Sequence, residues 1–423
     1  MVNACHNLNP QQRAAVEHFR GPILVLAGAG SGKTRVLTHR VAHLVKAHGI
    51  DPQAILAVTF TNKATTEMRE RLYALLGKDA ERLWVATFHS AALTMLRRHA
   101  RELDFSSNFT VYDEDDAKAL MKVLLKELSI DDKRYPPSSF LRVIDQCKNA
   151  YLTPAQFADK VRGSQAEMQA RVYDQYQRAL RAADALDFGD LLMHAVMLLE
   201  QNHNIRALYQ HRLQFILVDE FQDTNQVQYR FISLLAAQHK NLLVVGDDDQ
   251  SIYAFRGATL DNILHFERDY PGCKVVTLEQ NYRSTGTVLE LAHGVISRNR
   301  ARKPKKLWTE SGRGEPAQVY LADDEGDEAA FIAHRIRSHH EQEHRQFQEC
   351  AVFYRTNAQS RAIEEALVNA RIPYRIFGGL KFYERAEIKD ITAYLRLLVN
   401  PADNQAFLRV VNTPPRGIGA QTV

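Results

Sequence analysis

Residues 23–34, with the sequence ILVLAGAGSGKT, constrain the fold more than any other stretch of the chain. The apolar residues Ile23 to Leu26 predict a buried strand, and the glycines that follow predict a loop. Beyond the loop, apolar residues recur on one face of a predicted helix, at Val36, Leu37, Val41, Leu44 and Val45. A glycine loop in this position can curl its backbone N–H groups around phosphate oxygens, because no Cβ blocks their approach.

The order strand, glycine loop and helix, with Gly32-Lys33-Thr34 at the loop's end, is typical of P-loop NTPases. Lys33 would reach the β and γ phosphates, and the Thr34 hydroxyl would hold Mg²⁺. The helix N-terminus would add its partial positive charge. One position departs from the usual pattern, since its first glycine is replaced by Ala27. The alternative is an ordinary glycine turn. The predicted phosphate-binding residues are Ala27, Gly28, Ala29, Gly30, Ser31, Gly32, Lys33 and Thr34.

Composition limits the classes of protein that fit. A chain of 423 residues is too long for one core, so two to four domains are expected. The formal net charge of +4 is small, so a nucleic-acid surface would have to be a local groove. Four scattered cysteines fit a reducing compartment and argue against a zinc site. We expect a cytoplasmic protein with no membrane partner, because no apolar run reaches membrane-spanning length and no signal-peptide core is present.

Three further predicted strands would complete a nucleotide site. The strand at 215–218 ends in Asp219, a Mg²⁺ ligand, and Glu220, which would polarise the attacking water. The strand at 242–245 is followed by Gln250, which could touch the γ-phosphate and lies close to the aromatic and basic residues Tyr253, Phe255 and Arg256. The strand at 274–278 leads to Tyr282 and Arg283, which could stack on adenine and reach phosphate oxygens.

Two other predicted strands end in residues suited to bases and phosphates. The strand at 55–60 delivers Phe60 and Asn62, and the strand at 83–86 delivers His89. Aromatic rings beside small polar and basic residues suit base stacking, although a lone histidine is more often structural. Near the N-terminus, Gln12 follows Pro10 in a short predicted helix and could read an adenine edge. From these residues alone, a solvated glutamine is the more common outcome.

Residues 90–205 read as almost wholly helical, which predicts an inserted helical subdomain. Most of its lysines are expected on solvated helix faces, and a groove is the alternative; they include Lys118, Lys122, Lys126 and Lys148. A basic run at 298–306 favours a solvated loop over phosphate contact. Strand patterns at 317–321, 350–354 and 373–377 predict a second α/β domain.

Taken together, the motifs resemble the UvrD/Rep/PcrA family of superfamily 1A DNA helicases. The resemblance rests on LNPQQ (8–12), AGAGSGKT (27–34), TFTNKA (59–64), TFHS (87–90), VDEFQDTN (218–225), VGDDDQSIYAFRGA (245–258), QNYRS (280–284) and FYERAEIKD (382–390). It implies a 3′ to 5′ single-strand DNA translocase that uses ATP and Mg²⁺ and acts at junctions of duplex and single strand. Repair or replication proteins would be its partners.

The resemblance also implies roles for individual residues. Gln12 would read adenine while Tyr282 stacks on it, and Arg283 and Gln250 would sense the γ-phosphate. The implied catalytic residues are Lys33, Glu220, Gln250 and Arg283. The implied DNA-binding residues are Phe60, Asn62, His89, Tyr253, Phe255, Arg256, Arg355 and Asn357. The family often has tryptophan where this chain has Phe255, a smaller ring that still stacks.

The predicted fold class is α/β, with a RecA-like parallel sheet, an inserted helical subdomain and the start of a second RecA-like domain. The expected boundaries are 1–89 with 206–279 for domain 1A, 90–205 for 1B, 280–376 for the first part of 2A and 377–423 for the start of 2B. Later family motifs, including one that carries a second arginine, are not found in these residues, so only the N-terminal part of the family is expected here.

Two other functions remain open at this point. A nucleotide- and DNA-binding module without unwinding activity would follow if the missing motifs are essential. A P-loop kinase would share the phosphate cradle and the Mg²⁺ site, but it would not explain the aromatic residues after the other strands. Stimulation of ATP hydrolysis by single-stranded DNA separates these functions.

Overall fold

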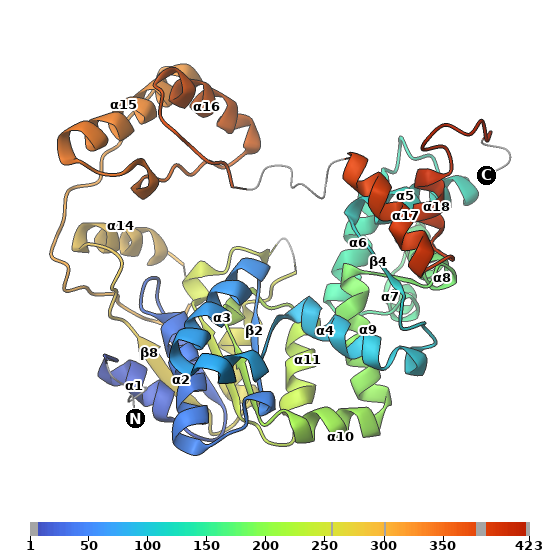
Figure 1. The fold of residues 1–423 in the computed structure, drawn as a ribbon, viewed down its shortest axis with the longest axis horizontal. Coiled ribbons are helices and arrows are strands. Elements are labelled where there is room, and N and C mark those ends of the chain that lie inside the picture. The colour runs from blue at the N-terminus through green and yellow to red at the C-terminus, as the bar shows by residue number, and fades with distance from the viewer. Residues whose placement is uncertain (1–6, 255–256, 300–301, 378–385, 420–423) are drawn as a thin grey trace. The chain divides into compact units, whose positions relative to one another are not determined.

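A computed structural model describes residues 7–254, 257–299, 302–377 and 386–419 (Figure 1). The chain divides into two compact units, and each is described by itself. The first unit consists of residues 1–314 and 392–423, and the second of residues 315–391. No helix within these described ranges is long and apolar enough to cross a membrane.

The centre of the first unit is a six-stranded sheet with the order β3-β2-β6-β7-β1-β8. Every neighbouring pair of strands is parallel, as in β1 and β7, where Ile23 lies opposite Leu243. The strands are β1 (Ile23–Ala27), β2 (Ile55–Thr59), β3 (Trp84–Thr87), β6 (Phe215–Val218), β7 (Leu242–Gly246) and β8 (Lys274–Leu278). The prediction of a parallel α/β sheet is confirmed. Continuous apolar runs suit such strands because helices cover both faces.

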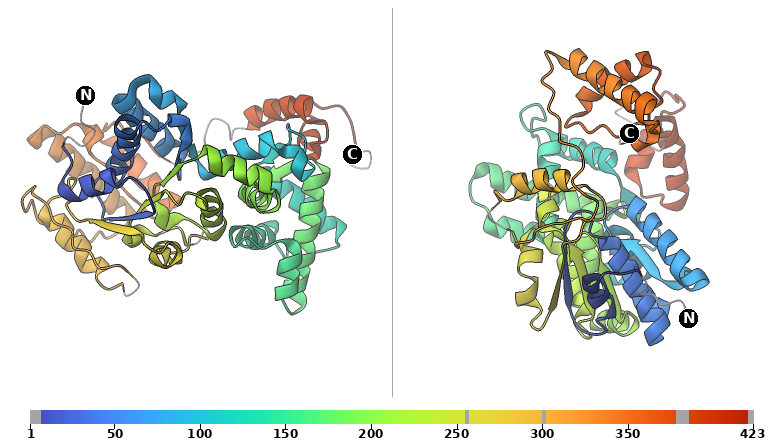
Figure 2. Two further views of the ribbon diagram at one scale, coloured as in Figure 1. Left: turned by 90° about the horizontal axis from the view of Figure 1, so that it is seen from below. Right: turned by 90° about the vertical axis from the view of Figure 1, so that its left-hand side faces the viewer.

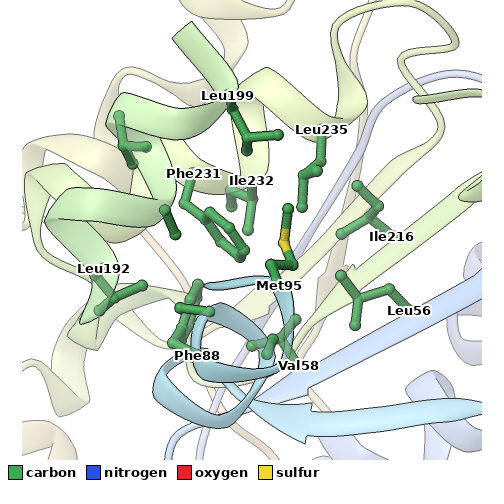
Figure 3. Packing of buried hydrophobic residues seen from close by; sticks show 14 of the residues in the cluster. Leu56, Val58, Phe88, Met95, Leu192, Leu199, Ile216, Phe231, Ile232 and Leu235 are labelled. Carbon is green, nitrogen blue, oxygen red and sulfur yellow. The ribbon is translucent and has the colours of Figure 1, made fainter. Parts of the chain in front are cut away.

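Two groups of helices cover the two faces of this sheet. Apolar residues of α1 (Pro10–Glu17), α2 (Lys33–His48) and α3 (Asn62–Leu76) form a core with one face. The other core contains α4 (Phe88–Arg98), α9 (Phe188–Gln201) and α11 (Gln226–Ala236). There, Leu56, Val58 and Ile216 of the strands lie against Met95 of α4 and Phe231 of α11 (Figure 3). The further views show the same division of helices about the sheet (Figure 2).

Part of the segment between β3 and β6 forms a third core, separate from the two cores on the faces of the sheet. Its helices are α5 (Glu114–Glu127), α6 (Pro137–Asn149), α7 (Pro154–Lys160) and α8 (Ser164–Ala182), and α10 (His203–Arg212) leads back to β6. The prediction of an almost wholly helical segment misses one element, because β4 (Thr110–Tyr112) and β5 (Ala185–Asp187) pair in parallel. Strands of three residues are too short to show an alternating pattern.

Lys148 of α6 also differs from the sequence prediction. Its ammonium is buried and lies 2.7 Å from Asp187 Oδ2 and 2.8 Å from Asp190 Oδ1. The sequence could not show this, because both aspartates belong to the N-terminal end of α9, about 40 residues away. Lys148 therefore fastens α6 to α9 instead of lying on a solvated face.

The last residues of the first unit return to the inserted segment. Helix α17 (Ala386–Val399) places Arg396 2.6 Å from Asp116 Oδ2 of α5, and Asp403 accepts a hydrogen bond from Tyr112. Helix α18 (Asn404–Val410) follows. The remaining helices of this unit are α12 (Asp261–Leu264), α13 (Phe266–Asp269) and α14 (Gly286–Ile296).

The second unit contains α15 (Glu325–Glu343) and α16 (Ser360–Asn369), which share a small core of alanine and aliphatic residues. The strands predicted at 317–321, 350–354 and 373–377 are not formed, so this prediction is wrong. Val319, Leu321 and Phe353 are between 87% and 94% exposed. A strand needs hydrogen-bonded neighbours to persist, and the described residues of this unit form no ladder for these segments.

Candidate functional site

Residues 28–32 connect β1 to α2 and form the predicted phosphate loop. Gly30 and Gly32 have φ angles of 67° and 88°, in the left-handed region that favours glycine. Contacts add to this requirement: a Cβ on Gly30 would lie 2.6 Å from Asn281 Nδ2, and one on Gly32 would lie 2.8 Å from Gln12 Nε2. Ala27, the departure from the usual pattern, is the last residue of β1 and is fully buried. Alanine fits there because this residue still belongs to the strand.

Lys33 begins α2, and its ammonium is the cation nearest the loop's acidic neighbours. Lys33 Nζ is buried and lies 3.0 Å from Glu220 Oε2, yet it makes no aligned hydrogen bond within the part of the chain that the structure describes. The helix N-terminus also carries no side-chain cap. An anion such as phosphate would satisfy both the Lys33 ammonium and the N-terminus of α2, so these residues fit a nucleoside triphosphate.

Two carboxylates follow β6 and face this cation. Asp219 is buried, and its Oδ2 lies 3.4 Å from the Thr34 hydroxyl, which donates to it. Burial and the neighbouring Glu220 raise the pKa of Asp219 to about 6, although Lys33 opposes the shift. A raised carboxyl pKa indicates unrelieved negative charge, which a divalent cation would neutralise. Thr34 and Asp219 can therefore provide the oxygen ligands that Mg²⁺ prefers.

Glu220 has a φ angle of 48°, unusual for a residue with a side chain. Such a conformation costs free energy and persists only where the surrounding structure holds it in place. Its carboxylate is partly exposed, so it can reach water while remaining close to Lys33. This geometry suits a group that polarises an attacking water.

Two further residues of this carboxylate loop belong to the site, and their only signal in the sequence is that both lie in the motif VDEFQDTN. Gln222 Nε2 donates to Glu220 Oε2 at 3.0 Å and to Asp223 Oδ2 at 3.2 Å, and its Oε1 accepts from the Asp247 N–H at 2.9 Å. Burial and Glu220 raise the pKa of Asp223 to about 6. Gln222 thus joins the loop after β6 to the loop after β7.

Gln250 ends a short 3₁₀ helix, η5 (Asp248–Gln250), after β7. Its Nε2 donates to Asp247 Oδ2 at 2.6 Å. The basic run predicted to be solvated lies against the same loop, which corrects that prediction: Arg302 pairs with Asp249 at 2.7 Å, and Lys305 Nζ lies 2.9 Å from Asp247 Oδ1. The run has no acid of its own, but aspartates more than 50 residues away pair with Arg302 and Lys305.

The QNYRS segment after β8 wraps around the phosphate loop. Asn281 Nδ2 donates to the Ala29 carbonyl at 2.6 Å, and the Tyr282 N–H donates to the Gly30 carbonyl at 2.9 Å. Arg283 is exposed, and its Cβ would be 2.7 Å from a Cβ placed on Gly30. Arg283 is therefore anchored beside the loop while its guanidinium remains accessible.

Asn9 connects Gln12 and Tyr282 through hydrogen bonds beside the phosphate loop. Asn9 caps α1 and exchanges hydrogen bonds with Gln12, whose Nε2 donates to the Ser31 carbonyl at 3.0 Å. Asn9 Nδ2 also donates to the Tyr282 hydroxyl at 2.9 Å. Gln12 is buried, so a solvated position is excluded, and Tyr282 is about half exposed and free to stack.

Arg40 is a further positioning residue that sequence patterns do not reveal. It is buried in α2, and its guanidinium donates to carbonyls at the C-terminal end of α1, including Ala15 in the last turn at 3.1 Å and Phe19 just beyond it at 3.3 Å. Burial lowers its pKa to about 10, which still leaves it charged. A cation at a helix C-terminus is favourable. Arg40 therefore holds α1, and with it Gln12, against the phosphate loop's helix.

The predicted DNA-binding residues lie at the ends of other strands. The rings of Phe60 and Tyr253 are stacked, with centroids 6.3 Å apart and an interplanar angle of 19°. Asn62 is exposed at the start of α3. His89 packs edge-on against Phe188, and burial lowers its pKa, so the ring stays neutral near pH 7. That weakens the case for His89 as a phosphate ligand.

Four further residues are predicted to bind DNA: Phe255, Arg256, Arg355 and Asn357. Phe255 and Arg256 lie outside the described residues. Arg355 and Asn357 belong to the second unit, where both are exposed near the 3₁₀ helix η8 (Asn357–Gln359). Their roles stay predictions.

Three features together define a P-loop NTPase with a RecA-like fold: the parallel sheet, the phosphate loop, and strand β6 with the carboxylates of Asp219 and Glu220 at its end. Comparison with known families then specifies the family. The model of the UvrD/REP helicase N-terminal domain matches residues 8–271, and that of the UvrD-like helicase C-terminal domain matches residues 276–423. This chain belongs to the UvrD/REP helicase family.

Individual relatives agree with this assignment. The ATP-dependent DNA helicase PcrA of Leuconostoc citreum is 49% identical over 99% of this chain and 56% of its own length. The PcrA helicase of Staphylococcus aureus is 46% identical over 100% and 58%, and the UvrD1 helicase of Mycobacterium bovis is 49% identical over 97% and 55%. The chain thus spans a little over half the length of these relatives. The expectation that only the N-terminal part of the family is represented is not confirmed, since the C-terminal-domain model also matches.

Proposed function

We propose that this protein is a DNA-stimulated ATPase that moves 3′ to 5′ along single-stranded DNA and opens duplexes at single-strand junctions. Membership of the UvrD/REP helicase family supports this, as do relatives named ATP-dependent DNA helicases. Free thiols at Cys147, Cys273 and Cys350 suit a cytoplasmic location. Repair or replication proteins are the proposed partners.

One observation carries the proposal: the nucleotide residues and the aromatic pair are joined by a single short segment. Gln250 donates to Asp247, which is linked to Glu220 through Gln222. Tyr253, three residues after Gln250, stacks on Phe60. A change at the γ-phosphate would therefore reach a base-stacking surface through a few covalent bonds. A kinase that acts on a small molecule does not need a base-stacking surface connected to its nucleotide site, so this connection favours the DNA-stimulated ATPase.

Specific residues are assigned specific tasks. Lys33 would bind the β and γ phosphates, Thr34 and Asp219 would hold Mg²⁺, and Glu220 would accept a proton from the attacking water. Bound Mg²⁺ would neutralise charge on the phosphates. Gln250 and Arg283 would sense the γ-phosphate, and Gln12 with Tyr282 would select adenine.

The test measures ATP hydrolysis with and without single-stranded DNA, and then strand separation of duplexes that carry either a 3′ or a 5′ tail. We expect hydrolysis to rise with DNA, and only the 3′-tailed duplex to open. Equal rates of ATP hydrolysis with and without single-stranded DNA would contradict the proposal and favour the kinase. Opening of only the 5′-tailed duplex would show movement from 5′ to 3′ and would contradict the proposed polarity.

A further inference from the structure

Residues 302–308, called the strap here, cross the phosphate loop of the first unit. Gly28 of the loop has no room for a side chain, because a Cβ there would lie 2.2 Å from Leu307 Cδ2. At the end of the strap, the Trp308 N–H donates to the Glu279 carbonyl at 3.0 Å, and the Trp308 carbonyl accepts from the Asn281 N–H at 2.8 Å. The strap therefore touches both the phosphate loop and the segment that carries Tyr282 and Arg283.

Lys305 fastens the middle of the strap to the loop after β7. Its side chain is 3% exposed, and its ammonium lies 2.9 Å from Asp247 Oδ1, 2.9 Å from Asp249 Oδ2 and within hydrogen-bond distance of Asp248 Oδ1. Arg302 adds a two-pronged contact to Asp249, at 2.8 and 2.7 Å. Burial lowers the pKa of Lys305, but the three carboxylates outweigh it and raise the pKa overall. Lys305 therefore stays charged and holds the strap against the loop after β7 through buried ion pairs; this cluster of Lys305 with the three aspartates is called the clasp here.

Asp247 links this clasp to a predicted γ-phosphate sensor. One of its carboxylate oxygens faces Lys305, and the other accepts from Gln250 Nε2 at 2.6 Å. Its N–H is held by Gln222, which also contacts Glu220. Loss of the Lys305 ammonium would remove the partner of Asp247 Oδ1, so the Asp247 carboxylate could turn and the Gln250 amide would lose an acceptor of fixed position.

We propose that Lys305 is a positioning residue for ATP turnover: it holds the strap on Gly28 and, through Asp247, orients the Gln250 amide toward the γ-phosphate. The proposal rests on the proposed function, because it takes the ligand of this site to be a nucleoside triphosphate. It predicts that Lys305 distinguishes ATP from ADP, since only ATP carries the group that Gln250 would contact.

The test compares Lys305→Met with the wild type and with Lys306→Met. Lys306 is the matched control, because its side chain is exposed and has no ion pair among the described residues. We measure kcat and KM for ATP with single-stranded DNA, and the dissociation constants of ADP and of a non-hydrolysable ATP analogue. For Lys305→Met we expect kcat to fall about 10- to 100-fold, the usual cost of a misplaced reacting group. The analogue should lose its affinity advantage over ADP, while ADP binds as in the wild type.

Two results would overturn the proposal: an unchanged kcat, or equal weakening of ADP and the analogue, which would indicate a merely structural clasp. If Lys305→Met does not fold, Asp248→Asn serves instead. Asp248 contacts Lys305 and the Lys303 N–H but not Gln250, so this change loosens the strap alone. For Asp248→Asn we then expect a smaller loss of the preference for the ATP analogue over ADP. An unchanged preference would contradict the proposal. A wild type that binds nucleotide without hydrolysing it would contradict the proposed function instead, and the two dissociation constants would still test Lys305.

Discussion

The two functional sides of the same sheet edge are built from different interactions. On the nucleotide side, Lys33, Asp219, Gln222 and Gln250 are charged or polar, mostly buried, and linked by hydrogen bonds and ion pairs. On the proposed DNA side, Phe60 and Tyr253 are partly exposed rings that contact each other through their faces. We therefore expect that mutations can change ATP hydrolysis and DNA binding separately, although one segment joins the two sides.

The largest effect is expected from Lys33→Ala. Removal of the Lys33 ammonium should reduce ATP hydrolysis to background, because this buried cation would offset the charge of the β and γ phosphates. Steady-state ATPase rates with saturating DNA measure this. Lys46→Ala, an exposed lysine in the same helix, should hydrolyse ATP like the wild type. Full activity of Lys33→Ala would show that the loop is not the catalytic cradle.

Glu220→Gln should slow hydrolysis by about 10²- to 10⁴-fold, the usual worth of a positioned general base. Glutamine keeps the size and can still accept from Gln222, so ATP affinity should stay close to that of the wild type. Single-turnover hydrolysis and equilibrium nucleotide binding separate the two quantities. Glu70→Gln, on an exposed position of α3, is the control. Collapse of ATP affinity would instead make Glu220 a structural partner of Lys33.

Tyr253→Ala tests the other side of the comparison. Loss of one base–aromatic stack should weaken single-strand DNA binding by about 1–3 kcal/mol, while ATP hydrolysis without DNA changes little. Fluorescence anisotropy of a labelled oligonucleotide gives the affinity. Tyr73→Ala removes an equally large but exposed ring from α3 and should have no effect. Unchanged DNA affinity in Tyr253→Ala would mean that the Phe60–Tyr253 pair serves only the core.

The smallest effect concerns stability without nucleotide or metal. Because burial and the neighbouring Glu220 raise the pKa of Asp219 from the ordinary range of an aspartate to about 6, its protonation favours the folded state. This contribution is complete below about pH 4 and is lost as the pH rises through about 6. Asp219→Asn should therefore stabilise the protein at pH 7 by on the order of 1–2 kcal/mol, and not at pH 4.

Urea unfolding at the two pH values measures this difference. Asp79→Asn, an exposed aspartate, is the matched control and should leave the free energy of unfolding unchanged at both. An Asp219→Asn variant less stable than the wild type at pH 7 would show that Asp219 already has a stabilising partner. Such a result would remove the electrostatic contrast between the two sides of the sheet edge.

Much of the first unit could be predicted from local patterns. Continuous apolar runs predicted all six strands of the main sheet, within one residue at most of their ends. Because parallel strands end at one edge, the same patterns also predicted that Lys33, Asp219 and Gln250 would be neighbours. The prediction failed in the second unit, where apolar residues such as Leu321 and Phe353 look strand-like but are almost fully exposed. Strand formation depends on partners, and periodicity does not report whether partners are present.

The sequence by itself determined the residue types at the ends of the strands, and with them the chemistry of the candidate site. Only the tertiary structure decided which distant charges meet: Lys305 with the three aspartates after β7, Lys148 with Asp187 and Asp190, and Arg40 with the end of α1. A lysine in a hydrophilic run has the same sequence pattern whether it is solvated or buried. What separates the two outcomes is whether folding brings enough opposite charge to offset the loss of water.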